Sequence, residues 1–273
     1  MGCPNRAGKV MTNKPMIGVA AVVVVAGLGT AYYLHHRGAQ TAPAPAIAQS
    51  VPAAAEPPIE HPVPAAGGET ASKVPLPALE DSDPPMRDAL GDAIGADAVM
   101  RYLVPENIIR HLVVTIDNLP RQKVPVDRRP TVTVPGPFLA DGDELHATLD
   151  PKNFARYEPL IAVLRGLDMQ KTAQVYLRFY PLFQHVYQDL GYPNGYFNDR
   201  LVQVIDSLLK TPQPAGPLEL TRPNVMYTFA DPDLESRPAG QKLLLRMGPQ
   251  NAAVVEDKLK ELRVIITAAP PKR

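Results

Sequence analysis

Two groups of polar residues in this sequence have the types and spacing to bind a ligand. The first group combines an acid, two arginines and a phenol at the starts of two amphipathic segments, and consists of Arg156, Tyr157, Asp199 and Arg200. The second group lies in the stretch GQKLLLRMGPQN, and consists of Gln241, Lys242, Arg246 and Asn251. Cations and amides near a helix start suit an anion such as a phosphate or a carboxylate. The competing interpretation is that these side chains cap helices or form ion pairs within the fold.

Paired acids offer a second kind of chemistry. Asp231, Asp233 and Glu235 in DPDLE could supply the two carboxylates of a hydrolase, and Asp199 is a further candidate. Helix capping competes here too, because these acids gather just before GQKLLL. No serine lies in a G-x-S-x-G or S-x-x-K pattern, and the six histidines lack the spacing of a zinc site. We therefore expect no metal and no cofactor, and the sequence assigns no catalytic residue.

Charge and motifs argue against nucleotides and nucleic acids as ligands. Lys and Arg number 28, against 28 Asp and Glu, whereas a nucleic-acid-binding protein usually carries a basic domain. Gly240 and Lys242 do not fit the G-x-x-x-x-G-K-[ST] pattern of a phosphate-binding loop. The RMGPQNAAVV stretch is similar to the turn of a helix-hairpin-helix motif but lacks its preceding glycine. Gly248 and Pro249 are instead expected to end one helix and start the next.

The elements that must position these residues are mostly helices. Apolar residues recur at helical spacing over 84–103, 105–119, 150–168, 169–193, 196–212 and 249–266. We expect a kink or a restart at Pro181, and Pro105 in the first turn of its helix. Residues 131–134 are expected to form a short edge strand, and 217–229 a short hairpin or an extended segment. The predicted fold class is mainly α: a compact multi-helix domain with a few short strands or extended segments.

A single transmembrane helix is predicted near the amino terminus. Residues 16–34 carry no charge, and as a helix they would measure roughly 28 Å, close to the hydrocarbon thickness of a bilayer. Lys and Arg in residues 1–15 place this short basic tail in the cytoplasm. A cleaved signal peptide is the alternative, with AIA at 46–48 as its cleavage site. Small residues spaced four apart in the span would allow a homodimer to form through the membrane.

A linker rich in proline and alanine, residues 35–78, follows the predicted span. Nine prolines lie between positions 40 and 77, and they prevent a regular helix or sheet. We expect a semi-rigid spacer that holds a helical head domain, residues 79–268, away from a membrane. Residues 269–273 are expected to be a disordered tail.

Three long stretches of the head resemble one known family. The stretches GYFNDRLVQVIDSLLKTP, DPDLESRPAGQKLLLRMGPQN and FARYEPLIAVLRGLD resemble the bacterial family called domain of unknown function 3014. The resemblance covers roughly residues 79–268. It implies a membrane-anchored envelope protein with a proline-rich spacer, which agrees with the anchor and linker above. No catalytic residue carries over from the resemblance, because the family has no established activity.

Together these features predict a single-pass protein of the bacterial inner membrane. Its amino terminus would be cytoplasmic, and its head domain would lie in the periplasm and act as a binding or scaffold module. The expected partners are the lipid bilayer through residues 16–34, an envelope protein and a second copy of the chain; nucleic acid is not expected. The alternative is an envelope hydrolase with an unrecognised carboxylate site that uses acids such as Asp199 or Asp231.

Overall fold

The computed structural model describes residues 58–64, 75–143 and 146–268. The predicted tail and span, residues 1–34, lie outside these ranges, as do most of the predicted linker and residues 269–273. Within the described ranges, no helix is both long enough and apolar enough to cross a membrane.

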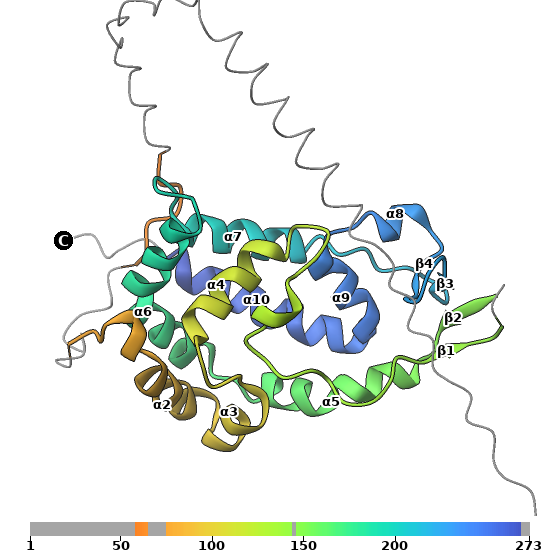
Figure 1. Cartoon of the computed structure of the whole chain (residues 1–273), viewed down its shortest axis with the longest axis horizontal. Coiled ribbons are helices and arrows are strands. Elements are labelled where there is room, and N and C mark those ends of the chain that lie inside the picture. The colour runs from red at the N-terminus through yellow and green to blue at the C-terminus, as the bar shows by residue number, and fades with distance from the viewer. Residues whose placement is uncertain (1–57, 65–74, 144–145, 269–273) are drawn as a thin grey trace, which may run out of the picture. The chain divides into compact units, whose positions relative to one another are not determined.

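Helices dominate the described residues, which confirms the prediction of a mainly helical domain (Figure 1). In the described ranges, two short 3-10 helices are present, η1 (Leu79–Asp81) and η2 (Val126–Arg128). The α-helices are α2 (Asp83–Ile94), α3 (Ala96–Tyr102), α4 (Ile108–Asn118), α5 (Lys152–Arg165), α6 (Met169–Asp189), α7 (Phe197–Leu208), α8 (Pro232–Glu235), α9 (Ala239–Met247) and α10 (Pro249–Ile266).

A small antiparallel sheet accompanies the helices. Its strands follow one another in the order of the sequence, and are β1 (Ala140–Asp141), β2 (Ala147–Leu149), β3 (Glu219–Thr221) and β4 (Thr228–Phe229). The hairpin expected at 217–229 is confirmed as β3 and β4. The strand expected at 131–134 is wrong, since Thr131 forms only an isolated bridge with Leu103. Pro130 and Pro135 flank this segment and cannot donate to a ladder, so pairing does not extend.

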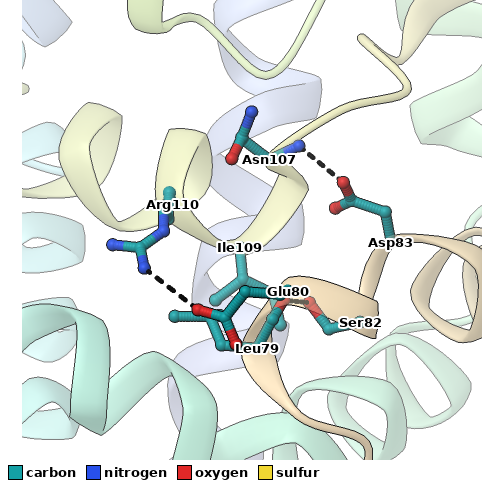
Figure 2. Close-up of a pocket in the computed structure, with 7 residues that line it drawn as sticks. All are labelled: Leu79, Glu80, Ser82, Asp83, Asn107, Ile109 and Arg110. Atoms are coloured by element: carbon teal, nitrogen blue, oxygen red, sulfur yellow. Dashed lines mark hydrogen bonds and ion pairs between the residues drawn. The ribbon is translucent and has the colours of Figure 1, made fainter.

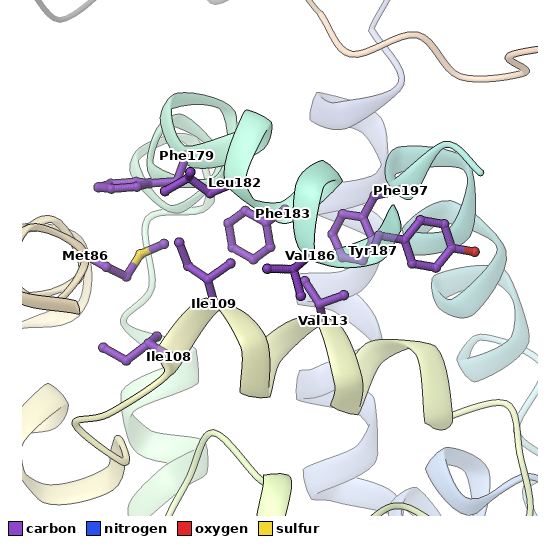
Figure 3. Packing of buried hydrophobic residues seen from close by; sticks show 10 residues of the cluster. All are labelled: Met86, Ile108, Ile109, Val113, Phe179, Leu182, Phe183, Val186, Tyr187 and Phe197. Carbon is purple, nitrogen blue, oxygen red and sulfur yellow. The ribbon is translucent and has the colours of Figure 1, made fainter. Parts of the chain in front are cut away.

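The first core cluster joins α2, α4 and α6 (Figure 3). Ile109 and Val113 of α4 are four residues apart, so they lie on one face and meet Phe183 and Val186 of α6. The ring of Phe183 stacks on that of Phe197, at the start of α7, with centroids 5.7 Å apart. Burial of one such phenylalanine contributes roughly 2–3 kcal/mol. This cluster therefore fixes where α7 begins.

A second core cluster surrounds α10, which packs against α5, α6, α7 and α9. The corner between α9 and α10 lies at Gly248 and Pro249, as predicted. Gly248 has φ 87°, a left-handed conformation that favours glycine. A Cβ atom at this position would lie 2.6 Å from Cγ of Phe154. The corner thus needs a glycine both for its backbone conformation and for the close approach of α5.

The largest departures from the sequence-based helix boundaries lie at Gly95 and at the start of α4. The predicted helix 84–103 is interrupted at Gly95, whose φ of 93° separates α2 from α3. Pro105 does not lie in the first turn of α4, because that helix begins only at Ile108. Its amino end is capped from outside by Asp83, whose carboxylate accepts the N–H groups of Asn107 at 2.7 Å and Ile108 at 2.9 Å. The residues around Pro105 form no sequence pattern that would predict the contact with Asp83.

The helix α6 runs without a break through Pro181. The expected restart at this proline is therefore wrong. Proline removes one backbone hydrogen bond and crowds the preceding turn. The helix nevertheless continues, because it is packed along its length against α2, α4, α7 and α10.

Candidate functional site

A short piece of the predicted linker is docked on the head domain. Residues 58–64 lie beside the start of α7, more than 130 positions away in the chain (Figure 1). The carboxylate of Asp199 accepts the N–H of Glu60 at 3.1 Å and the N–H of His61 at 2.6 Å. The hydroxyl of Tyr196 accepts the N–H of Val63 at 2.9 Å. Asn198 donates from Nδ2 to the carbonyl oxygen of His61 at 2.8 Å. We call Tyr196, Asn198 and Asp199 the clamp.

The central residue of the clamp is rigidly held. Asn198 is fully buried, and its Oδ1 accepts the hydroxyl of Tyr176 at 2.9 Å. Its Nδ2 also donates to the carbonyl oxygen of Ile266, at the end of α10. Burial raises the pKa of Tyr176 well above its ordinary value, so this phenol stays protonated and remains a donor. The Tyr176 hydroxyl and the Ile266 carbonyl oxygen therefore hold the Asn198 amide in the orientation that contacts His61.

A groove of about 360 Å³ lies alongside the docked segment. Its lining is mostly polar, and consists of Glu60, His61, Asp199, Val202, Gln203, Asp206, Ser207 and Lys210. Asp206 binds Arg263 of α10 through two hydrogen bonds, at 2.6 and 3.1 Å. The hydrogen bond from Arg263 lowers the pKa of Asp206, so its carboxylate stays charged. The groove therefore presents two carboxylates and one ammonium beside the segment.

Asp199 and Arg200 are neighbours in the chain but bind different parts of the fold. Arg200 donates from Nε to Oδ1 of Asp117 at 2.9 Å and from Nη2 to the Asp117 carbonyl oxygen at 2.7 Å. Asp117 is only 3 % exposed, and its Oδ2 also accepts Arg121 at 2.7 Å and the hydroxyl of Tyr192. Arg200 thus helps to neutralise a buried carboxylate and fastens α7 to α4. It has the role that the ion-pair interpretation gave it.

Arg156 and Tyr157, the other half of the first predicted group, hold the fold together on α5. Arg156 donates from Nε to the Pro135 carbonyl at 3.0 Å and from Nη2 to the Gly136 carbonyl at 2.8 Å. Tyr157 packs against the second core cluster. The hydrogen bonds of Arg156 on α5 and of Asp199 and Arg200 on α7 therefore go to different partners.

The second predicted group surrounds the corner between α9 and α10. Lys242 is buried and donates from Nζ to Oε1 of Glu235 at 2.8 Å. The guanidinium of Arg246 lies over the ring of Phe229, 5.1 Å from its centroid. Each of these contacts belongs to the packing of α9 against the end of α8 and the sheet. The structure adds no observation that favours an anion at this corner.

The two amides of that group are buried. Gln241 donates from Nε2 to the Ser207 carbonyl at 2.6 Å, while its Oε1 has no partner among the described residues. Asn251 donates from Nδ2 to the carbonyls of Phe154 and Met247, at 3.0 and 2.9 Å. These bonds connect α9 to α7 and α10 to α5. The side chains predicted as a ligand site are thus used between helices.

A small cavity of about 80 Å³ lies where η1 and α2 meet α4 (Figure 2). Arg110 pairs with Glu80 at 3.8 Å on one side, and Asp83 accepts the Asn107 N–H on the other. Ligand pockets usually measure roughly 300–1,000 Å³. This cavity is therefore smaller than a typical ligand pocket. It lies where helices pack together, and its polar group Asp83 caps the start of α4.

The turn between β3 and β4 presents two apolar side chains to solvent. Val225 is 77 % exposed and Met226 is 75 % exposed. Arg222 donates from Nε to the carbonyl oxygen of Val225 at 3.1 Å, and its guanidinium lies 5.4 Å from the ring centroid of Tyr227. We call residues 222–227 the braced tip. Turn residues are usually polar or glycine, so a valine and a methionine held outward at a hairpin tip are unusual.

Sequence reasoning missed most of these two surfaces. It selected Asp199, but not the two other residues of the clamp, and it did not single out the braced tip. One signal was present for the clamp: Glu60 and His61 interrupt a tract of proline, alanine and valine. For the tip, the signal was the Val-Met pair directly after Arg-Pro-Asn.

Across residues 58–64, 75–143 and 146–268, no three His, Cys, Asp or Glu side chains are placed to hold a metal ion.

Comparison with known proteins gives one match. A family model described as "Protein of unknown function (DUF3014)" matches residues 108–263. No curated protein and no solved structure matches the chain. The clamp and the braced tip both lie inside the matched range, whereas the docked segment lies before it.

Proposed function

This chain belongs to the DUF3014 family, whose model covers more than half of its 273 residues, and we propose that it displays a binding module in the bacterial envelope. A transmembrane helix at residues 16–34 would anchor the chain in the inner membrane. The helical head would lie in the periplasm and bind an envelope protein. The charge pattern of residues 1–34 supports the topology.

The braced tip is the observation that carries the binding function. Side chains as exposed as Val225 and Met226 gain little stability for the fold that presents them. The bond from Arg222 braces the turn, and such bracing lowers the ordering cost when a partner arrives. Methionine is common on surfaces that contact other proteins, because its unbranched side chain adapts to them. The tip therefore has the character of a protein contact.

The acids of the alternative function, a hydrolase, have other roles in the fold. Asp199 accepts two backbone N–H groups of the docked segment. Asp231 caps α8 by accepting the N–H of Asp233 at 2.8 Å. These contacts support a structural and binding role for both carboxylates, and we take the binding module as the conclusion.

Labelling of single cysteines tests the topology. The chain has one cysteine, Cys3, which is expected in the cytoplasm. A Cys3→Ser, Lys260→Cys variant moves it to an exposed position on α10. In cells with only the outer membrane permeabilised, a membrane-impermeant maleimide should label the variant and spare Cys3 of the unchanged chain. Labelling of Cys3 together with protection of the cysteine at 260 would overturn the proposed topology.

Site-specific photo-cross-linking tests the binding function. A photoreactive amino acid replaces Met226 in the full chain, in intact cells. The matched control places it at Val264, which is also apolar and 69 % exposed, but lies on α10. We expect a discrete cross-linked protein from position 226 and none from position 264. Equal products from both positions, or none from either, would count against a contact surface at the tip.

A further inference from the structure

The acceptors of the clamp pair one by one with the backbone N–H groups of the docked segment. Asp199 accepts the N–H groups of Glu60 and His61, and Tyr196 accepts the N–H of Val63. The residue between them is Pro62, which has no N–H to satisfy. Every N–H from position 60 to position 63 therefore has an acceptor on the head.

The contacts are made mainly to the backbone. The side chain of Glu60 is exposed, and those of His61 and Val63 are only partly buried. The polar bonds of the clamp involve no side chain of the segment. Recognition therefore depends on the spacing of backbone donors, with proline at the position that lacks one.

The conformations of both sides of this contact are restricted by groups outside it. Prolines at 58, 62 and 64 limit the conformations of the segment, which reduces the entropy lost on docking. On the head, Asn198 is completely buried and held by Tyr176 and the end of α10.

We propose that Tyr196, Asn198 and Asp199 form a peptide-binding site. Its ligand is a segment that bends so that the backbone N–H groups of two successive residues meet one carboxylate, with a proline next and a further donor after the proline. Its resident ligand is the chain's own segment, residues 60–63, bound in cis. This site is separate from the braced tip and does not depend on the function proposed for it.

Hydrogen–deuterium exchange in the full chain, purified in detergent, tests the resident ligand. The amides of Glu60, His61 and Val63 should exchange at least ~10-fold more slowly than in an Asp199→Asn variant, which removes the charged acceptor. Asp257→Asn is the matched control, because it removes an exposed carboxylate on α10. Protection that is absent from the unchanged chain, or that survives Asp199→Asn in full, would refute the site.

A second pair of variants leaves the head untouched, in case Asp199→Asn disturbs its folding. His61→Pro deletes the N–H that lies 2.6 Å from Asp199. His61→Ala changes the same side chain but keeps that N–H. Exchange at Glu60 and Val63 should accelerate in the proline variant and stay slow in the alanine variant. Equal behaviour of the two variants would contradict backbone recognition.

A labelled peptide tests the ligand class in trans. The probe is the chain's own sequence EPPIEHPVPA, residues 56–65. It is titrated onto the full chain in which residues 60–63 are replaced by Gly and Ser. We expect saturable binding, at least ~10-fold weaker binding to the same chain with Asp199→Asn, and competition from the cis segment in the unchanged chain. No binding to the emptied site would overturn the peptide-binding assignment.

A measurement of the oligomeric state distinguishes binding of the chain's own segment from binding of the segment of a second copy. If the segment of a second copy filled the clamp, amide protection would fall on dilution together with the mass of the particle. That result would overturn the cis assignment. Because these measurements are made in solution, their failure leaves the membrane topology and the braced tip untouched.

Discussion

The ammonium group of Lys242, in α9, donates hydrogen bonds to two oxygens of Glu235, the last residue of α8. Its Nζ lies 2.8 Å from Oε1 of Glu235 and 3.0 Å from the Glu235 carbonyl oxygen. The other carboxylate oxygen of Glu235 accepts the N–H of Phe229, in β4, at 2.9 Å. One ion pair therefore connects α8, α9 and the sheet.

Replacement of Lys242 by methionine should destabilise the head domain by about 2 kcal/mol, because the partly buried Glu235 carboxylate loses its charged donor. Lys260→Met is the control, since that lysine pairs with Asp257 on the surface, and it should change stability by less than about 0.5 kcal/mol. Urea unfolding of both variants measures the difference. A Lys242 variant as stable as its control would show that the pair contributes nothing.

The same pair predicts an acid dependence of stability. Burial raises the pKa of Glu235, but the hydrogen bonds from Lys242 and Phe229 and the charges of Lys242 and Arg246 outweigh it, so the pKa lies below its ordinary value of 4.5. A carboxyl whose pKa is lower in the folded state adds stability above its unfolded pKa and loses it as the pH falls through the folded value. Glu235→Gln should therefore be less stable than the unchanged chain at pH 7. The difference in the free energy of unfolding between the two proteins should narrow below pH 4.5. A gap that stays constant down to pH 2 would argue against this assignment.

Glu256 of α10 should show the opposite effect. Burial raises its pKa above the ordinary value of 4.5, so the folded state binds this proton more tightly than the unfolded state does. Stability is then lost as the pH rises through this range, and the loss persists at neutral pH. Glu256→Gln should stabilise the protein at pH 7 by about 0.5–1 kcal/mol. The two unfolding curves should converge at pH 3.

The corner at Gly248 gives a steric prediction. Gly248→Ala should cost at least about 2 kcal/mol, because φ is 87° and the added Cβ would meet the ring of Phe154. Gly216→Ala is the matched control, since its Cβ would meet nothing within 4 Å and its φ is not positive. Thermal unfolding should separate the two variants clearly. Similar midpoints would mean that the α9–α10 corner can relax.

The parts of the fold that follow from local spacing could be predicted from the sequence. The apolar stripe of residues 249–266 and the Gly-Pro step before it are enough to place α10 and its start. The start of α4 could not be placed, because Asp83, more than twenty positions earlier, supplies its cap. Arg200 and Lys242 could be recognised as ion-pair candidates. The partner of Arg200 could not be named, since Asp117 lies on another helix. For Lys242 the sequence offers several nearby acids, and only the fold selects Glu235.

The clamp shows the same limit at longer range. An Asn-Asp pair at a helix start is the ordinary signature of a cap. Only the fold brings Glu60 and His61 to Asn198 and Asp199. Every residue except proline has the same backbone N–H group. A site that binds backbone N–H groups therefore does not require particular side chains in its ligand, and the sequence of the ligand gives little indication of the site.

The docked segment also changes where a mechanical load would enter the domain. Tension applied through the chain before residue 58 would reach the fold first at the bonds to Asp199, and so at α7. That helix contributes buried side chains to three core clusters, including Phe197, Val204 and Ile205. Without the clamp, the same tension would reach η1, whose three residues include none that is buried. The clamp would therefore direct this force into a helix whose start is packed in the core, rather than into a short 3-10 helix with no buried residue.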